Sequence, residues 1–261
     1  MTQPRFAAKK RLGQHFLVDE NLLGVIGRLA ELGADDRVLE IGPGLGILTA
    51  YLAEHTRHVD TVELDRELES RLRERLAECE NVSLHFGDAL ALDLARLAPE
   101  ATKLVANLPY NIATPLIVES LDGLPQIELW CVMVQREVAD RLFASPGSKA
   151  YGAVSVLVQL ASEKSGFHPV SREVFRPRPR VESALVAFER RPLPEGFARI
   201  KRLVVAAFAH RRKTLANSLA ISGLLSREEA EAILGRIGHD PRIRAEALTP
   251  PEFAALAEVM P

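Results

Sequence analysis

The stretch Asn107-Leu108-Pro109-Tyr110 combines residue types that can bind an amino group carried by a flat ring. It follows the apolar run 103–106, which predicts a buried parallel strand ending in a loop. The Asn107 side-chain oxygen and the Leu108 carbonyl can accept both amine protons, and the Tyr110 ring can stack on the base. Pro109 lacks an N–H and fixes φ, so it stiffens the loop. A planar aminated base is the expected guest; a loop with a buried tyrosine is the alternative.

A glycine-rich turn precedes this loop in the chain. The apolar run 37–41 is followed by Gly42, Gly44 and Gly46 at alternate positions, and then by an amphipathic stretch. This pattern predicts a strand, a tight turn and a helix, because glycine permits close approach to a ligand and positive φ. The G-x-G-x-G spacing differs from the G-x-G-x-x-G that binds dinucleotide pyrophosphates. Glu40, just before the turn, would repel a pyrophosphate but suits a cation such as the sulfonium and ammonium of S-adenosylmethionine.

Two further predicted strands end in carboxylates. The run 58–63 ends in Glu63, about 20 residues after the glycines, where an acid can bind ribose hydroxyls. The run 82–86 leads into Asp88, which can accept a hydrogen bond from the amino group of an adenine ring. Three consecutive strands thus end in groups suited to a nucleoside ligand; solvated acids at strand ends are the alternative for Glu63 and Asp88.

Taken together, the motifs of the chain resemble those of the ribosomal small-subunit RNA adenine dimethyltransferase family, known for conferring kasugamycin sensitivity. The resemblance covers nearly the whole chain, and its last three motifs are specific. It rests on G-Q-H-F-L at 13–17, E-I-G-P-G-L-G at 40–46, N-L-P-Y-N-I-A-T-P at 107–115, F-R-P-R-P-R-V-E-S at 175–183 and H-R-R-K-T-L-A-N-S-L at 210–219.

The resemblance implies an α/β fold: a Rossmann-like class I S-adenosylmethionine-dependent methyltransferase with a mainly parallel sheet, plus a small C-terminal all-helical domain. It implies transfer of up to two methyl groups to adenine N6, with Phe175 sandwiching the base against Tyr110; Phe175 as a hydrophobic plug is the alternative. The cofactor-binding residues it implies are His15, Leu17, Gly42, Gly44, Gly46, Glu63, Asp88 and Asn107. His15 stands where the family usually has Asn, which makes the ring's tautomer a new variable.

Charge along the chain predicts the RNA surface. The formal net charge is −2, yet residues 1–15 carry +4 and residues 172–213 carry +8 on an otherwise acidic chain. Basic blocks on an acidic body indicate a phosphate-binding surface, with arginines on solvated helices as the alternative. The expected RNA-binding residues are Arg176, Arg178, Arg180, Arg211, Arg212 and Lys213.

The pattern of apolar runs predicts two domains. From about residue 37 to 135, short strands alternate with helices, and further strands are expected at 163–168 and 184–190, forming an antiparallel end to the sheet. A break at 191–196 divides a methyltransferase domain, 1–191, from a helical RNA-binding domain, 192–261, with helices near 197–209, 212–222, 226–236 and 250–258. No apolar run is long enough to span a bilayer, and the basic first residues lack the apolar region of a secretory signal. We expect a cytoplasmic monomer without metal.

The expected partners are small-subunit rRNA and the immature small ribosomal subunit, with a role in subunit biogenesis. Two alternatives remain open. A large-subunit rRNA adenine methyltransferase would share the fold, although its loop usually reads N-I-P-Y. A ribosome assembly factor acting mainly by binding would make methylation secondary, although the intact acceptor loop favours chemistry.

Overall fold

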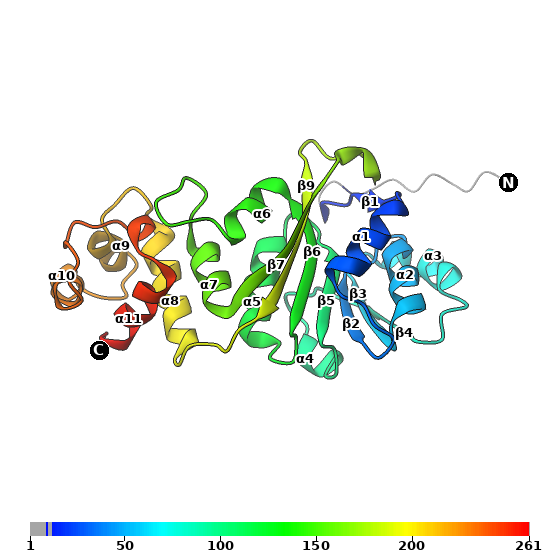
Figure 1. The fold of residues 1–261 in the computed structure, drawn as a ribbon, viewed down its shortest axis with the longest axis horizontal. Helices are drawn as coiled ribbons and strands as arrows, with labels where there is room; N and C mark the ends of the chain where they lie inside the picture. Colours follow the sequence, from blue (N-terminus) through cyan, green and yellow to red (C-terminus); the bar gives the residue numbers. More distant parts are fainter. Residues whose placement is uncertain (1–8, 10–11, 261) are drawn as a thin grey trace. The chain divides into compact units, whose positions relative to one another are not determined.

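The computed structural model describes Lys9 and residues 12–260. The elements near the amino end build the sheet and its cover (Figure 1). They are β1 (Phe16–Leu17), α1 (Asn21–Leu29), β2 (Arg37–Ile41), α2 (Ile47–His55), β3 (His58–Glu63), η2 (Arg66–Leu68), α3 (Glu69–Arg75), β4 (Val82–Phe86), α4 (Leu94–Leu97), β5 (Lys103–Asn107), α5 (Ala113–Gly123) and β6 (Leu129–Gln135).

The later elements complete the sheet, and those after β9 are all helices. They are α6 (Arg136–Leu142), α7 (Ala153–Ala161), β7 (Ser162–Val170), η3 (Arg172–Val174), β8 (Phe175–Arg176), β9 (Ser183–Arg190), α8 (Phe197–Ala209), α9 (Leu215–Ile221), α10 (Arg227–Arg236), η4 (Ala245–Ala247) and α11 (Pro250–Glu258).

Seven strands form one sheet in the order β4-β3-β2-β5-β6-β9-β7. The pairs from β4 to β6 are parallel, and β9 runs antiparallel to β6, with Gln135 opposite Ser183. The antiparallel end expected from the sequence is therefore confirmed. The carboxyl ends of the parallel strands meet at one edge, where open α/β sheets bind ligands.

Both faces of the sheet are covered. Val38 and Leu39 are successive residues of β2 and both are fully buried, which requires helices on both sides of a pleated strand. On one face, Val38 packs with Leu22 and Ile26 of α1. On the other, Trp130 of β6 donates a hydrogen bond to Ser120 of α5 at 2.9 Å.

The described residues separate into two compact units. One comprises Lys9, 12–139 and 164–190, and the other comprises 140–163 and 191–260. The break after residue 190 lies next to the expected one at 191/192. Residues 140–163, which the sequence placed in the first domain, group with the C-terminal helices because the fully buried Tyr151 donates to the Leu248 carbonyl at 2.8 Å and packs edge-on against Phe208.

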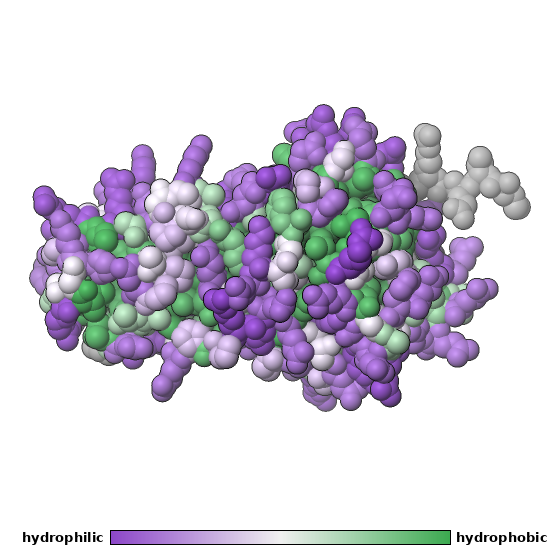
Figure 2. All heavy atoms as spheres, viewed as in Figure 1, coloured by the Kyte–Doolittle hydropathy of each residue, from purple (hydrophilic) through white to green (hydrophobic). Residues whose placement is uncertain are grey.

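The described residues include no helix long and apolar enough to cross a membrane, and no group of three His, Cys, Asp or Glu side chains placed to hold a metal ion. Hydrophilic side chains cover most of the face drawn in Figure 2, with smaller apolar areas between them. Some exposed apolar side chains lie beside the carboxyl edge of the sheet: Leu64 is 50% exposed directly after β3.

Candidate active site

A cavity of about 190 Å³ lies at the carboxyl ends of β2, β3, β4 and β5. Residues 12–17 form part of its wall from the amino-terminal side. The cavity brings together most of the residues expected from the sequence, which lie up to 95 positions apart along the chain. These are His15, Leu17, Gly42, Gly44, Glu63, Asp88, Asn107, Leu108, Pro109 and Tyr110.

The turn after β2 depends on glycine at three positions. Gly42, Gly44 and Gly46 have φ of 77°, 59° and 75°, in the left-handed region that L side chains rarely adopt. A Cβ on Gly44 would lie 2.8 Å from the Phe16 ring, so the backbone and β1 are packed as closely as they can be. Gly46 does not line the cavity; it precedes the first residue of α2 in a left-handed conformation. In the structure Gly46 begins that helix, and its contact with the cofactor stays a prediction.

Glu40 is a buried carboxyl group in the cavity wall. It is 1% exposed, and its Oε2 atom has no hydrogen-bond partner in the described structure. Burial raises the pKa of Glu40 to about 8, although Thr49 and Thr61 act in the opposite direction. A buried carboxyl without a partner is costly, so this site favours a cationic ligand that would pair with it.

Glu63 ends β3 and is held by main-chain donors. Its carboxylate accepts from the Gly44 N–H at 3.1 Å and the Asp65 N–H at 2.8 Å. Burial raises the pKa of Glu63, and these two hydrogen bonds oppose the shift. Asp88 follows β4, is exposed, and accepts from the Leu90 N–H at 3.0 Å. Both carboxylates therefore face the cavity with fixed orientations and spare lone pairs.

The Asn107 side chain is oriented by the amino-terminal segment. Its Nδ2 donates to the His15 carbonyl at 3.0 Å, which leaves Oδ1 without a described partner at the cavity. The Leu108 N–H donates to the Met133 carbonyl at 3.1 Å, which fixes the peptide that follows Asn107. The amide is thus set with its acceptor oxygen available and its donor occupied.

Tyr110 is fixed at its hydroxyl. That hydroxyl shares a hydrogen bond of 2.6 Å with the hydroxyl of Ser183 on β9, and the ring lies 5.2 Å from the His15 ring, centroid to centroid. Burial raises the pKa of Tyr110, while the bond to Ser183 opposes the shift. A neutral, anchored ring that borders the cavity is suited to stacking on a base.

The structure defines the tautomer of His15, the residue that stands where the family usually has Asn. Its Nδ1 lies 2.7 Å from the Pro177 carbonyl. A carbonyl can only accept, so Nδ1 carries the proton and donates it. In the neutral ring Nε2 is then an acceptor, and it becomes a donor only in the imidazolium form.

Phe175 lies elsewhere than the sequence predicted. It is fully buried, it does not line the cavity, and it packs in the core with Leu17, Met133 and Leu185. The reason is the pairing of β8 with β1, which sets Phe175 opposite Leu17. In this structure the Phe175 ring is a buried core side chain, as in the hydrophobic-plug alternative, and has no exposed face to stack on a base. Leu17 is also largely buried, although it reaches the cavity wall.

The expected RNA-binding residues are all exposed, and they differ in whether a neighbouring group engages the side chain. Arg176 donates to the Glu173 and Phe175 carbonyls, Arg178 pairs with Glu173, and Arg180 is exposed. Arg211 pairs with Glu246 at 3.0 Å and donates to the Lys149 carbonyl at 2.9 Å. Arg211 is exposed but engaged within its own unit, whereas the equally exposed side chains of Arg212 and Lys213 make no ion pair or hydrogen bond in the described structure.

The basic cluster does not lie on a helix. A helix was expected over 212–222, but α9 begins at Leu215 because the Thr214 hydroxyl caps it by accepting from the Asn217 N–H. A turn precedes it, closed by the Lys213 N–H donating to the His210 carbonyl at 2.8 Å. Arg212 and Lys213 lie in this turn.

Sequence reasoning missed two kinds of lining residue. Leu64 and Ala89 follow the acids of β3 and β4 and give the cavity apolar surface. Leu64 directly follows Glu63 and Ala89 directly follows Asp88, and this position next to an expected site residue could have indicated both. Leu12 is of the second kind, and no local pattern places it at the cavity; Gln14 also lines the cavity, and its signal was the G-Q-H-F-L motif at 13–17.

Comparisons with known proteins identify the family of the chain. The family model described as ribosomal RNA adenine dimethylase matches residues 5–259. The chain belongs to the ribosomal RNA adenine dimethylase family. It is 50% identical to ribosomal RNA small subunit methyltransferase A of Rubrobacter xylanophilus, over 95% of this chain and 93% of that protein. It is 44% identical to the protein of that name from Lactiplantibacillus plantarum, over 97% and 90%.

Solved structures show the same fold. A dimethyladenosine transferase from Plasmodium falciparum superposes with a TM-score of 0.77 at 24% identity, covering 93% of this chain and 96% of that one. The 23S rRNA methyltransferase ErmE gives 0.67 at 29% identity, covering 93% and 98%. The expected class I methyltransferase fold and the enzyme class are thereby confirmed, and S-adenosylmethionine is the methyl donor of this family.

The residues present fit that cofactor. The unpartnered Glu40 oxygen offers a partner for a cationic group, the positive-φ glycine turn leaves its backbone accessible, and Glu63 can accept from hydroxyls. Asp88 and the apolar side chain of Leu64 border the same space. These groups are thus the binding partners that a cationic nucleoside requires.

Proposed function

We propose that this enzyme dimethylates N6 of two adjacent adenosines in the 3′-terminal hairpin loop of small-subunit (16S) rRNA. It would act as a cytoplasmic monomer on the immature small ribosomal subunit and so take part in rRNA processing and subunit biogenesis. The proposal is supported by family membership and by relatives named ribosomal RNA small subunit methyltransferase A. It is carried by one observation: Asn107 presents its amide oxygen at a cavity suited to the methyl donor.

The protein contributes to the reaction by positioning the adenine amine relative to the methyl group. When bound, S-adenosylmethionine supplies the electrophilic methyl group. The Asn107 oxygen and the Leu108 carbonyl accept the two amine protons, which favours a pyramidal nitrogen whose lone pair is available. Tyr110 stacks on the extruded adenine, and stacking of this kind contributes about 1–3 kcal/mol per base. Holding the reacting atoms at roughly 3–3.5 Å can supply much of the rate acceleration, and water can take the proton lost after transfer.

Asn107→Ala tests the amine-acceptor role. Removing the amide should lower methyl transfer at least about 100-fold, the scale of loss for a misplaced reacting group. Binding of S-adenosylhomocysteine, measured by calorimetry, should stay within about threefold, because Asn107 is only one of the expected cofactor-binding residues and the others are untouched. Asn21→Ala is the matched control, since Asn21 is exposed at the start of α1. Transfer by Asn107→Ala at the wild-type rate would exclude the role.

Substrate choice separates the alternatives. Tritium transfer from labelled cofactor is compared for unmethylated small subunits, free small-subunit RNA and free large-subunit RNA, and the products are mapped by mass. We expect two adjacent dimethyladenosines in the small subunit. Modification confined to large-subunit RNA would favour the large-subunit enzyme, and tight binding without transfer would favour an assembly factor.

A further inference from the structure

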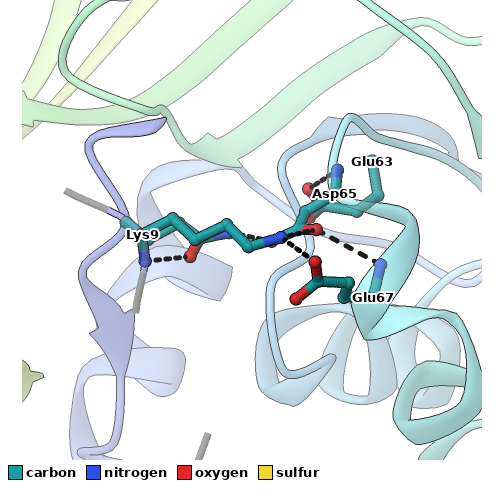
Figure 3. Close-up of polar contacts among 5 residues, drawn as sticks. Lys9, Glu63, Asp65 and Glu67 are labelled. Atoms are coloured by element: carbon teal, nitrogen blue, oxygen red, sulfur yellow. Dashed lines mark hydrogen bonds and ion pairs between the residues drawn. The ribbon is translucent and has the colours of Figure 1, made fainter. Parts of the chain in front are cut away.

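The amino-terminal side of the cavity is fastened to the turn after β3 by polar side chains. Lys9 reaches across to that turn, where its Nζ lies 2.7 Å from Asp65 Oδ1 and 2.8 Å from Glu67 Oε1 (Figure 3). Lys9 and Asp65 are 56 positions apart along the chain. The contact therefore joins two segments that no local structure holds together.

Gln14 completes the connection. Its Oε1 accepts from the Lys9 N–H at 2.8 Å, and its Nε2 donates to Asp65 Oδ2 at 3.0 Å. Both oxygens of the Asp65 carboxylate are thus engaged by the amino-terminal segment, and that side chain is only 4% exposed. Burial acts to raise the pKa of Asp65, but the hydrogen bonds from Lys9, Gln14 and the Glu67 N–H lower it overall. The hydrogen bond to Asp65 is the main cause that raises the pKa of Lys9.

The fastened segment meets both halves of the active site. On one side, the Asp65 N–H donates to Glu63 Oε1 at 2.8 Å, and Glu63 in turn accepts from the Gly44 N–H. On the other side, the carbonyl of His15, the residue after Gln14, accepts from Asn107 at 3.0 Å. Residues 12–17 lie between these contacts as cavity wall.

We propose that Lys9 and Gln14 are positioning residues that fasten segment 12–17 to Asp65, and so hold the cofactor-cavity wall and aim Asn107 through the His15 carbonyl. The inference rests on the proposed function for the role of Asn107, and on family membership for the cofactor.

Charge explains why a cation is needed here. Glu63, Asp65 and Glu67 stand at alternate positions, and Glu63 and Asp65 repel each other. An exposed ion pair contributes little on its own. This one differs because its acceptor carboxylate is nearly buried, and a buried carboxylate that loses its partner is destabilised. Without Lys9, the turn and the segment would separate in order to hydrate Asp65.

The test compares three single variants. Lys9→Gln removes the charge, Lys9→Arg keeps it, and Arg73→Gln is the control because it breaks an exposed ion pair between Arg73 and Glu69 within α3. Lys9→Gln should weaken S-adenosylhomocysteine binding and raise KM for S-adenosylmethionine about tenfold, equivalent to 1.4 kcal/mol. It should lower kcat only about threefold, because Asn107 keeps its side chain and loses only its orientation. Lys9→Arg should restore most of both, and Arg73→Gln should change neither.

Hydrogen exchange and a double-variant cycle separate positioning from a general loss of stability. In the protein without cofactor, Lys9→Gln should speed amide exchange at residues 12–17 while exchange in β5 and β6 stays unchanged. Asp65→Asn retains an oxygen that can accept from the Glu67 N–H, so the turn can still form. Because both changes break one contact, the double variant should be no worse than the worse single variant.

Three outcomes would overturn the proposal: unchanged exchange at 12–17, unchanged S-adenosylhomocysteine affinity, or additive effects of Lys9→Gln and Asp65→Asn. Failure of the proposed function would look different. In that case rRNA would not be methylated even by the unaltered enzyme, while the binding and exchange effects of Lys9→Gln would persist.

Discussion

At the scale of single residues, the buried Glu40 couples cofactor binding to protons. Its pKa is raised to about 8 by burial, so its carboxyl is mostly protonated at pH 7 in the protein without cofactor. A carboxyl whose pKa is raised in the folded state stabilises the fold at low pH, and that contribution is lost as pH rises toward 8. A cation beside Glu40 would reverse the shift and favour the carboxylate.

Cofactor binding at pH 7 should therefore release a proton from Glu40. Calorimetry in two buffers of different ionisation enthalpy measures the number released. Glu40→Gln should release close to one proton fewer than the unaltered protein, since its amide does not titrate. Asp60→Asn is the control, because Asp60 is a β3 carboxylate that does not line the cavity. Equal proton release by Glu40→Gln and the unaltered enzyme would contradict a cationic partner for Glu40.

Residue roles could be predicted where the chemistry is local to a strand end. Asn107, Glu63 and Asp88 each follow a recognisable apolar run, and all three reach the cavity. Phe175 could not be placed in this way, because the pairing of β8 with β1 decides which way its ring points. That pairing joins segments about 160 positions apart, and nothing in the motif around Phe175 encodes it.

At the scale of elements, the glycine turn and β1 depend on each other. Gly44→Ala would place its Cβ 2.8 Å from the Phe16 ring and would also strain a residue with φ of 59°. Gly147→Ala has the same backbone strain, with φ of 77°, but its Cβ would meet nothing within 4 Å. Each should lose about 1 kcal/mol through the left-handed backbone. Gly44→Ala alone should also weaken S-adenosylhomocysteine binding, by calorimetry, more than about tenfold. Equal cofactor affinity in the two variants would show that β1 can move to make room for the added Cβ without weakening cofactor binding.

Elements were predictable to the extent that their signals are periodic. The strands of the parallel sheet and the helix over 197–209 follow from apolar runs and spacing. The start of α9 was placed too early, because the basic run 211–213 looks helical while Thr214 provides the cap. The grouping of 140–163 with the C-terminal helices depends on the distant contact of Tyr151 with Leu248, which no local pattern reveals.

At the scale of the whole molecule, the basic block at 172–213 belongs to two compact units and not to one. It divides between the two compact units at residue 190, and its members differ in how far they are engaged. All three side chains are exposed, but Arg211 binds Glu246 and the Lys149 carbonyl within the second unit, while Arg212 and Lys213 make no such contact in the described structure. Total charge therefore overstates the number of side chains available to phosphates. We expect Arg212 and Lys213 to bind RNA and the neighbouring Arg211 to stabilise its own unit.

Replacing these neighbours one at a time tests that separation. Arg212→Gln and Lys213→Gln should each weaken binding to unmethylated small-subunit RNA and reduce the slope of log affinity against log salt by about 1, with unchanged thermal stability. Arg211→Gln should leave that slope unchanged, because its guanidinium is already paired. It should instead lose about 0.5–1 kcal/mol of stability, because its ion pair with Glu246 is partly exposed, and each kcal/mol corresponds to about 2–4 °C in Tm. If Arg211→Gln lowered the salt slope without lowering Tm, Arg211 would belong to the RNA surface after all, and its contacts to Glu246 and Lys149 would have to open when RNA binds.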